Sequence, residues 1–271
     1  AANTTGSVAI AGNAVVDLGT LTGASGIKIN VGNDTDEASG SATLLADKLE
    51  LAAATLNIDP AYTLPYASAI VQDLSGNDGD TLDGHVNVGN NALFAVGFDT
   101  KAEVDAVLGS LIKDGHFTKP AQPDPGPGTR SAVNPPDADV VVSPNAVVLN
   151  QAIKFGANGG IYVGTGSDVA GNNTLQVESG SALVITDKAF TVEPVTGKKK
   201  GPAIEANSTN GTATIAQGAK LVLVGAFNGA DNELEILKNF TAQDAALEKF
   251  TVSVGGSNLL ETKWKNGKLD I

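Results

Sequence analysis

Short apolar segments separated by corners of small residues recur along the chain. Each unit has an alternating strand, a corner and a second alternating strand. Seven such units are VAIAGNAVVDLG from Val8, ASGSATLLA from Ala38, VNVGNNALFAVG from Val86, VVVSPNAVVLN from Val140, LQVESGSALVITD from Leu175, TIAQGAKLVLVG from Thr214 and TVSVGGSNLLETKW from Thr251. The later corners lie at Pro144, Gly180, Gly218 and Gly256, at nearly equal intervals. This near-constant period predicts stacked units.

Alternation within the strands predicts which side chains share a core. Successive residues of a strand point to opposite faces. We therefore expect one core to contain Leu183, Ile185, Leu221 and Leu223, while Val222 faces outward. One unit cannot bury its apolar face alone, whereas stacked units can. The sequence thus predicts an all-β solenoid with successive corners above one another.

Three segments have patterns that favour or allow helix. The residues 99–114 follow capping residues and put one apolar stripe on a helix, formed by Val104, Val107, Leu108 and Leu111. A second helix is expected over 239–250, with Thr241 as its N-cap. The Ala- and Leu-rich residues 44–56 suit either helix or strand. We expect these segments to be short inserts that decorate or cap the β scaffold.

Proline divides the chain into three parts. Six of the eleven prolines fall within 120–136, where no hydrophobic periodicity is seen. Proline cannot donate a hydrogen bond to a strand ladder, so this part is predicted to be a linker or an extruded loop. The division is then a β-rich segment over 1–119, with its helical insert near 99–114, the linker over 120–136, and solenoid repeats of about 37 residues over 137–271.

Composition and charge narrow the function classes. The chain has no cysteine, which removes thiolate chemistry and is usual for exported bacterial proteins. Its net charge of −13 disfavours nucleic acid and anionic lipid as partners. Five lysines face 15 acidic residues in 1–119, against 11 and 14 in 137–271. No apolar run reaches the roughly 18 residues of a membrane span, so direct membrane insertion is not expected.

Candidate catalytic groups are few. No G-x-S-x-G motif occurs, and the two histidines, His85 and His116, lie in Gly- and Asp-rich stretches typical of turns. The single arginine is Arg130 in the proline-rich part, and the single tryptophan is Trp264. A sugar-cleaving β-helix needs clustered charged groups and aromatic rings. We therefore predict a protein that is not an enzyme and has no catalytic residues.

One segment has the composition of a calcium loop. SGNDGDTLDG over 75–84 offers hard oxygen ligands from Asp78, Asp80 and Asp83, the type that Ca²⁺ prefers. The alternative interpretation is a solvated polar turn, because the segment occurs only once. No other cofactor is expected. The three lysines Lys198–Lys200 lie between two strands and are expected at an exposed loop tip.

The segments 159–175, 175–187 and 214–225 resemble the passenger regions of bacterial type V autotransporters. That resemblance covers 140–271 best, and it implies a right-handed parallel β-helix displayed outside the cell. The translocator barrel of that family has no counterpart in these residues, so the chain would be a cleaved passenger or a piece of one. The implied function is adhesin-like, with a protein or glycan of a host or neighbouring cell, or copies of the chain itself, as partner. Alternatives are a self-assembling surface-layer or filament subunit, and a carbohydrate-active β-helix enzyme.

Overall fold

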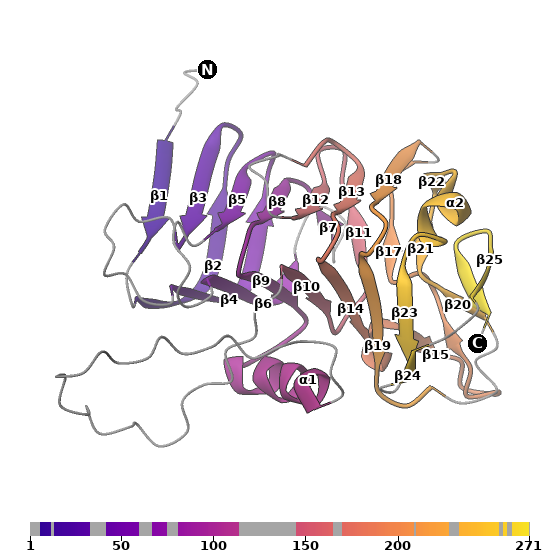
Figure 1. Ribbon diagram of the computed structural model, residues 1–271. Coiled ribbons are helices and arrows are strands. Elements are labelled where there is room, and N and C mark those ends of the chain that lie inside the picture. Colours follow the sequence, from indigo (N-terminus) through magenta and orange to yellow (C-terminus); the bar gives the residue numbers. More distant parts are fainter. Residues whose placement is uncertain are drawn as a thin grey trace, which may run out of the picture.

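Parallel β-sheets form most of the protein. The computed structural model describes residues 6–11, 14–32, 42–59, 67–74, 81–113, 145–164, 170–208, 210–227, 233–254, 257–258 and 262–270. Figure 1 shows the strands arranged along one direction, roughly in chain order from the N-terminus to the C-terminus. The described residues contain only two α-helices and one short 3-10 helix beside these strands. The expected all-β class with short helical inserts is confirmed at this level.

Three sheets contain most of the strands, and neighbours pair in parallel at every step except the last step of the second sheet. The first sheet has the order β1 (Gly6–Ile10), β3 (Ile27–Val31), β5 (Thr55–Ile58), β8 (His85–Val88), β12 (Gly160–Val163), β13 (Thr174–Val177), β18 (Gly211–Ile215), β22 (Phe240–Thr241). The second has the order β2 (Val15–Gly23), β4 (Thr43–Leu51), β6 (Ala67–Leu74), β9 (Ala92–Val96), β10 (Ala146–Leu149), β14 (Ala182–Thr186), β19 (Lys220–Val224), β23 (Thr251–Val254), β24 (Ser257–Asn258). The third has the order β21 (Leu237–Lys238), β17 (Ile204–Glu205), β11 (Ile153–Phe155), β7 (Thr81–Leu82).

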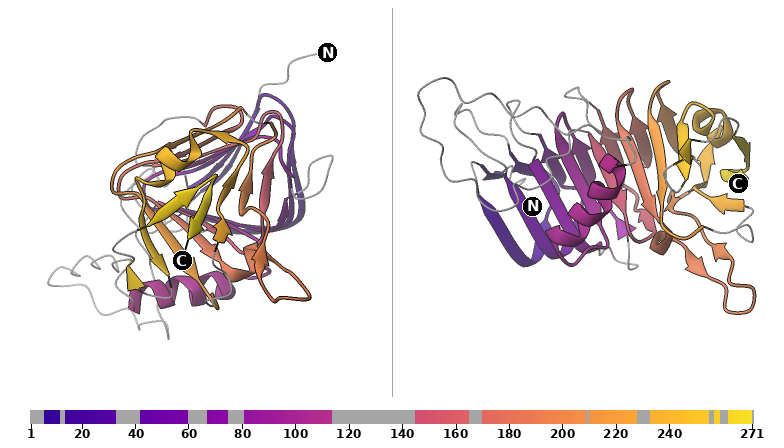
Figure 2. Two further views of the ribbon diagram at one scale, coloured as in Figure 1. Left: turned by 90° about the vertical axis from the view of Figure 1, so that its right-hand side faces the viewer. Right: turned by 60° about the horizontal axis from the view of Figure 1, so that its bottom comes forward.

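One hydrophobic core lies between these sheets. Its members include inward side chains from all three sheets and from both halves of the chain. In the second sheet the strand register places one such side chain above the next, in the row Val16, Leu44, Ala69, Phe94, Val147, Leu183, Leu221, Val252. The end-on view in Figure 2 shows the strands around this common interior. The four leucine and isoleucine side chains expected in the core are all in it.

The predicted stacking of corners is confirmed where the structure describes them. The backbone N–H of Gly180 donates to the carbonyl of Gly218 at 3.1 Å, so these two corners are adjacent. After each corner the strands pair in register, Ala146 with Ala182 and Ala182 with Lys220. These pairs reproduce the intervals between the corners in the sequence. The corner residues Pro144 and Gly256 lie outside the described residues.

The last unit does not follow the predicted spacing. Lys220 pairs with Thr251, so the first half of this unit occupies the place that was expected for its second half. The residues after Gly256 form β24, which folds back and pairs antiparallel with β23. The reason is a shortened return path, because the helix α2 (Gln243–Leu247) leads almost directly from β22 into β23.

The outer face of the second sheet is covered by the helix α1 (Lys101–Lys113). Its predicted stripe packs against the outward side chains of this sheet, among them Val222, and Val104, Leu108 and Leu111 are buried. Figure 1 shows α1 running beneath β9 and β10. Its start is capped because the Thr100 hydroxyl accepts from the backbone N–H of Glu103 at 3.3 Å. The prediction of a helix at this position is confirmed.

Of the other two segments, one differs from its prediction and the other adopts one of its two predicted alternatives. The helix α2 is shorter than the predicted 239–250, and its N-cap position holds Ala242 in the left-handed region, φ 50°. Thr241 is not the cap, because it lies in β22 and its hydroxyl donates to the carbonyl of Gly211 at 3.0 Å. The segment 44–56 is strand, since most of it forms β4 and the start of β5. Pairing with neighbouring strands decides the conformation of both segments.

The sheets continue across the predicted division of the chain. β9 and β10 are consecutive strands of the described chain and adjacent strands of the second sheet, with Leu93 paired to Ala146. The proline-rich residues 120–136 lie outside the described residues. A second connection of the same kind joins β12 and β13, which are neighbours in the first sheet. At these two places, consecutive parallel strands of the described chain are neighbours in one sheet.

Other elements cover the C-terminal end of the three sheets. A separate three-stranded sheet is formed by β20 (Glu233–Glu235), β26 (Lys268–Asp270) and β25 (Lys263–Lys265). The backbone N–H groups of Ile236 and Leu237 donate to the carbonyl of Gly267, at 2.9 and 3.2 Å, so the turn between β25 and β26 closes the third sheet. β24 closes the second sheet, and α2 packs beside β18 of the first.

Candidate interaction surfaces

An antiparallel hairpin projects from the stacked sheets. It consists of β15 (Thr191–Val192) and β16 (Lys199–Lys200), and both views of Figure 2 show it standing away from the body. Val195 near its turn is 92% exposed and Val192 is 54% exposed. The lysines Lys199 and Lys200 form strand β16, so the expected loop tip for Lys198–Lys200 is wrong for these two. A two-residue strand pairing places them beside β15 instead.

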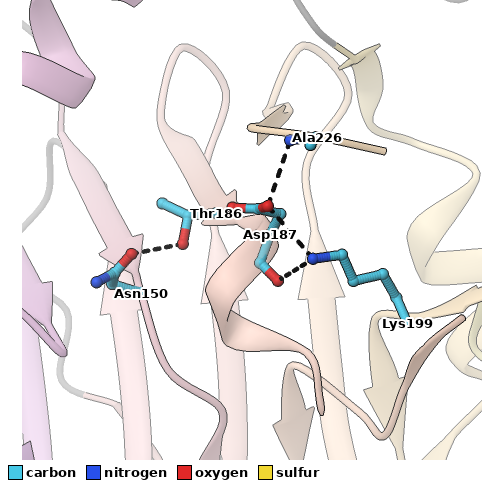
Figure 3. A network of polar contacts seen from close by, with 5 residues as sticks. All are labelled: Asn150, Thr186, Asp187, Lys199 and Ala226. Carbon is cyan, nitrogen blue, oxygen red and sulfur yellow. Dashed lines mark hydrogen bonds and ion pairs between the residues drawn. The ribbon is translucent and has the colours of Figure 1, made fainter. Parts of the chain in front are cut away.

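A polar network at the base of the hairpin anchors it (Figure 3). The ammonium group of Lys199 donates to the backbone carbonyl of Asp187 at 3.0 Å and lies 3.3 Å from its Oδ2. The same carboxylate oxygen accepts from the backbone N–H of Ala226 at 3.3 Å. The side chain of Lys199 is 12% exposed and that of Asp187 is 26% exposed, so the ion pair is partly shielded from solvent. The hairpin, the short helix η1 (Asp187–Ala189) and the corner after β19 are thereby joined.

Further hydrogen bonds follow the C-terminal ends of neighbouring strands in the second sheet. The hydroxyl of Thr186 donates to Oδ1 of Asn150 at 2.7 Å, and Nδ2 of Asn150 donates to the carbonyl of Gly97 at 2.7 Å. Gly97 and Asn150 directly follow β9 and β10, and Thr186 is the last residue of β14, so the three residues belong to successive strands of this sheet. Side-chain hydrogen bonds therefore tie successive corners together below the hairpin. Such bonds fix the base of the hairpin relative to the core.

A second ion pair spans the hairpin itself. Lys200 pairs with the carboxylate of Glu193, which also accepts a hydrogen bond from the hydroxyl of Thr196. The hydrogen bond from Lys200, followed by that from Thr196, lowers the pKa of the Glu193 carboxyl below its ordinary value. The backbone N–H of Glu193 donates to the carbonyl of Lys198 at 2.8 Å. The hairpin thus has its own polar contacts in addition to its anchor.

Asparagine side chains form a ladder on the outer face of the first sheet. Nδ2 of Asn87 donates to Oδ1 of Asn57, and Nδ2 of Asn57 donates to Oδ1 of Asn30, both at 2.8 Å. The side-chain oxygen Oδ1 of Asn87 accepts a hydrogen bond from the backbone N–H of Ala170 at 2.8 Å, which holds Ala170 against this face. The sequence carries a signal for this ladder, because each Asn follows an inward aliphatic residue in a paired strand. Our sequence interpretation missed it.

The predicted site residues are dispersed or lie outside the described part. Oδ1 of Asp83 accepts from the backbone N–H of Asn158 at 3.0 Å and from its side chain at 3.4 Å. Asp78 and Asp80 are outside the described residues, so the calcium site stays a prediction. Nε2 of His85 lies 2.8 Å from Oδ1 of Asn172, and His116 is also outside. Within the described ranges no three acidic, His or Cys side chains are placed to hold a metal ion.

The hairpin and the outer face of the first sheet carry different kinds of side chain. The hairpin exposes two valines and Lys198 and Lys200 together with threonine and proline side chains. The described outer face of the first sheet carries amides and hydroxyls together with Lys28 and His85. Neither helix among the described residues has the length and hydrophobicity of a membrane span. No protein-family model, no curated protein and no solved structure matches the chain. The class that the structure defines is therefore a mainly β protein with many-stranded parallel sheets.

Proposed function

We propose that this chain is a right-handed parallel β-helix, and that it acts as a non-enzymatic, adhesin-like protein at the bacterial cell surface. Parallel pairing in chain order around one interior supports the β-helix. In such a fold the stack holds inserted loops away from the body, where a partner can reach them. The resemblance of 140–271 to autotransporter passengers supports extracellular display.

The anchored hairpin is the observation that carries the adhesive function. Single exposed apolar side chains are common on protein surfaces, but Val192 and Val195 lie on an element that projects from the body, where a partner can reach them. Val195 is almost fully exposed at the end of an element whose base is held by the Lys199 and Asp187 pair. A preorganised loop loses less conformational entropy on binding than a free one. The proposed partner is a protein or glycan of a host or neighbouring cell.

A binding assay on whole cells and on a glycan panel tests this function. The purified chain is coupled to fluorescent beads, with albumin-coated beads as the background. We expect binding above background, and we expect Val195→Asp to reduce it at least tenfold. The matched control is Thr214→Asp, which adds the same charge on the exposed outer face of the first sheet. Binding at background level, or equal binding by both variants, would contradict the proposal.

A further inference from the structure

The N-terminal ends of the two larger sheets are open edges. β1 is the first strand of the first sheet, and β2 is the first strand of the second. In the part of the chain that the structure describes, neither strand has a neighbour on its outer side. Val8 is 53% exposed and Val15 is 64% exposed, whereas their partners Ile29 and Thr43 are almost fully buried. The side chains of β1 and β2 are therefore exposed because no further strand covers them among the described residues.

Within their described residues, these two edge strands carry little of the charge that usually prevents pairing. Proteins guard open strand edges with charged side chains, prolines or bulges. β1 reads GSVAI and has no charged residue, and β2 reads VVDLGTLTG and has only Asp17. The surrounding residues 1–119 are strongly acidic, so the low charge of the edge is a local exception. An uncharged, partly apolar edge is suited to pairing with another strand.

The opposite end of the molecule offers only short edge strands. There the first sheet ends in β22, the second ends in β24, and each of these strands has two residues. The turn between β25 and β26 covers the third sheet. The long edge strands β1 and β2 both lie at the N-terminal end, so a contact between the long edges of two copies is isologous.

We propose that two copies of this chain pair through these edges, β1 with β1 and β2 with β2, in antiparallel orientation about a twofold axis. Antiparallel pairing of β1 centred on Val8 sets Gly6 opposite Ile10, so inward side chains remain inward. In β2 the core-facing residues are Val16 and Leu18 before Gly19, and Leu21 after it. The alternation of inward and outward residues shifts by one position near Gly19. The proposed twofold axis passes near this position, so the residues before Gly19 in one copy face the residues after Gly19 in the other.

The contact is closed and forms a dimer. A twofold contact uses the same surface on both copies, so no open edge remains for a third. The inference goes beyond the proposed adhesive function, because it concerns the end of the stack and not the hairpin. It also differs from the filament alternative, which requires a head-to-tail contact.

Sedimentation equilibrium of the intact chain tests the dimer. We expect the mass of two chains, and a single chain for the double variant Val8→Lys with Val15→Lys. The matched control is Val192→Lys with Val195→Lys, which makes the same changes on the hairpin and should leave the dimer intact. Circular dichroism establishes whether each variant is folded.

Cross-linking decides the orientation and does not depend on the lysine variants. The chain has no cysteine, so Val8→Cys introduces a single thiol that lies next to its copy in the proposed pairing. We expect a disulfide-linked dimer after mild oxidation, and none with Val195→Cys. A single-chain mass for the unchanged protein, a dimer that depends on the hairpin valines, filaments, or no cross-link at Val8 would each overturn the proposal.

Discussion

Lys199→Met tests whether the polar network holds the hairpin. The substitution keeps most of the length and the apolar stem of the side chain but removes the charge and the N–H donors. Asp187 then loses the contacts to its carbonyl and to Oδ2, while the backbone N–H of Ala226 still donates to the carboxylate. We therefore expect the hairpin to open locally, with the stacked sheets intact.

The magnitude follows from the burial of the pair. A hydrogen bond to a charged group contributes about 1.5–3 kcal/mol when it is shielded from water. The two side chains are 12% and 26% exposed, so solvent screening reduces the value to about 1–2 kcal/mol. That free energy corresponds to a roughly fivefold to thirtyfold change in the local opening equilibrium.

Hydrogen exchange at the amide of Glu193 measures this opening. That amide donates to Lys198 across the hairpin, and an isolated two-stranded hairpin is marginally stable in water. Its exchange should therefore speed up by the same factor in Lys199→Met. The control Lys188→Met removes the same charge from an exposed neighbour of Asp187 and should change the rate little. Equal rates in both variants would refute the anchoring role.

Three further predictions concern backbone packing and one titrating group. Gly160→Ala places a methyl group against the carbonyl of Gly171, and we expect a loss of about 1–3 kcal/mol in the free energy of unfolding, measured with urea. Gly109→Ala lies in α1 with no atom near the new methyl group, and it should gain about 0.5–1 kcal/mol. By NMR titration the pKa of Glu193 should lie below its ordinary value, and Lys200→Met should raise it. The contact is therefore lost as pH falls through the lowered value, and an unchanged pKa in Lys200→Met would contradict its cause.

Alternating patterns predicted the strands of the second half because one face of each strand packs into the core and the other points away from it. Leu221 and Leu223 enter the core, and Lys220 follows the corner at Gly218. The same reasoning located α1, since its apolar stripe needed a surface to cover. That surface was less visible in the sequence, because the outward residues of the second sheet are small aliphatics such as Val184 that also suit a core.

Other features depend on contacts between residues distant in sequence. Thr241 is a residue type that often caps helices. Its hydroxyl instead donates to the carbonyl of Gly211, which lies in the neighbouring strand β18 of the first sheet. The sequence predicts Lys199 in an exposed run of lysines, whereas its ammonium group forms a partly buried ion pair with Asp187. The hydrogen bond from the backbone N–H of Asn158 to Asp83, a residue far away in sequence, is another contact of this kind, and the calcium site that includes Asp83 stays a prediction. The local sequence shows which hydrogen bonds or ion pairs a side chain can form. Which residue it actually contacts depends on the strand pairing that brings distant segments together.

What is constant from one level to the next is the register of the rows, and the length of chain between levels varies. Ala67 pairs with Ala92 after a short connection, whereas Leu93 pairs with Ala146 after a much longer one. The longer connection contains α1 and still returns to the adjacent place in the same sheet. Inserts at corners therefore leave the core rows undisturbed, because the rows depend only on strand pairing. This explains how one stack can hold both a covering helix and a projecting hairpin, and why a fixed period describes only part of the chain.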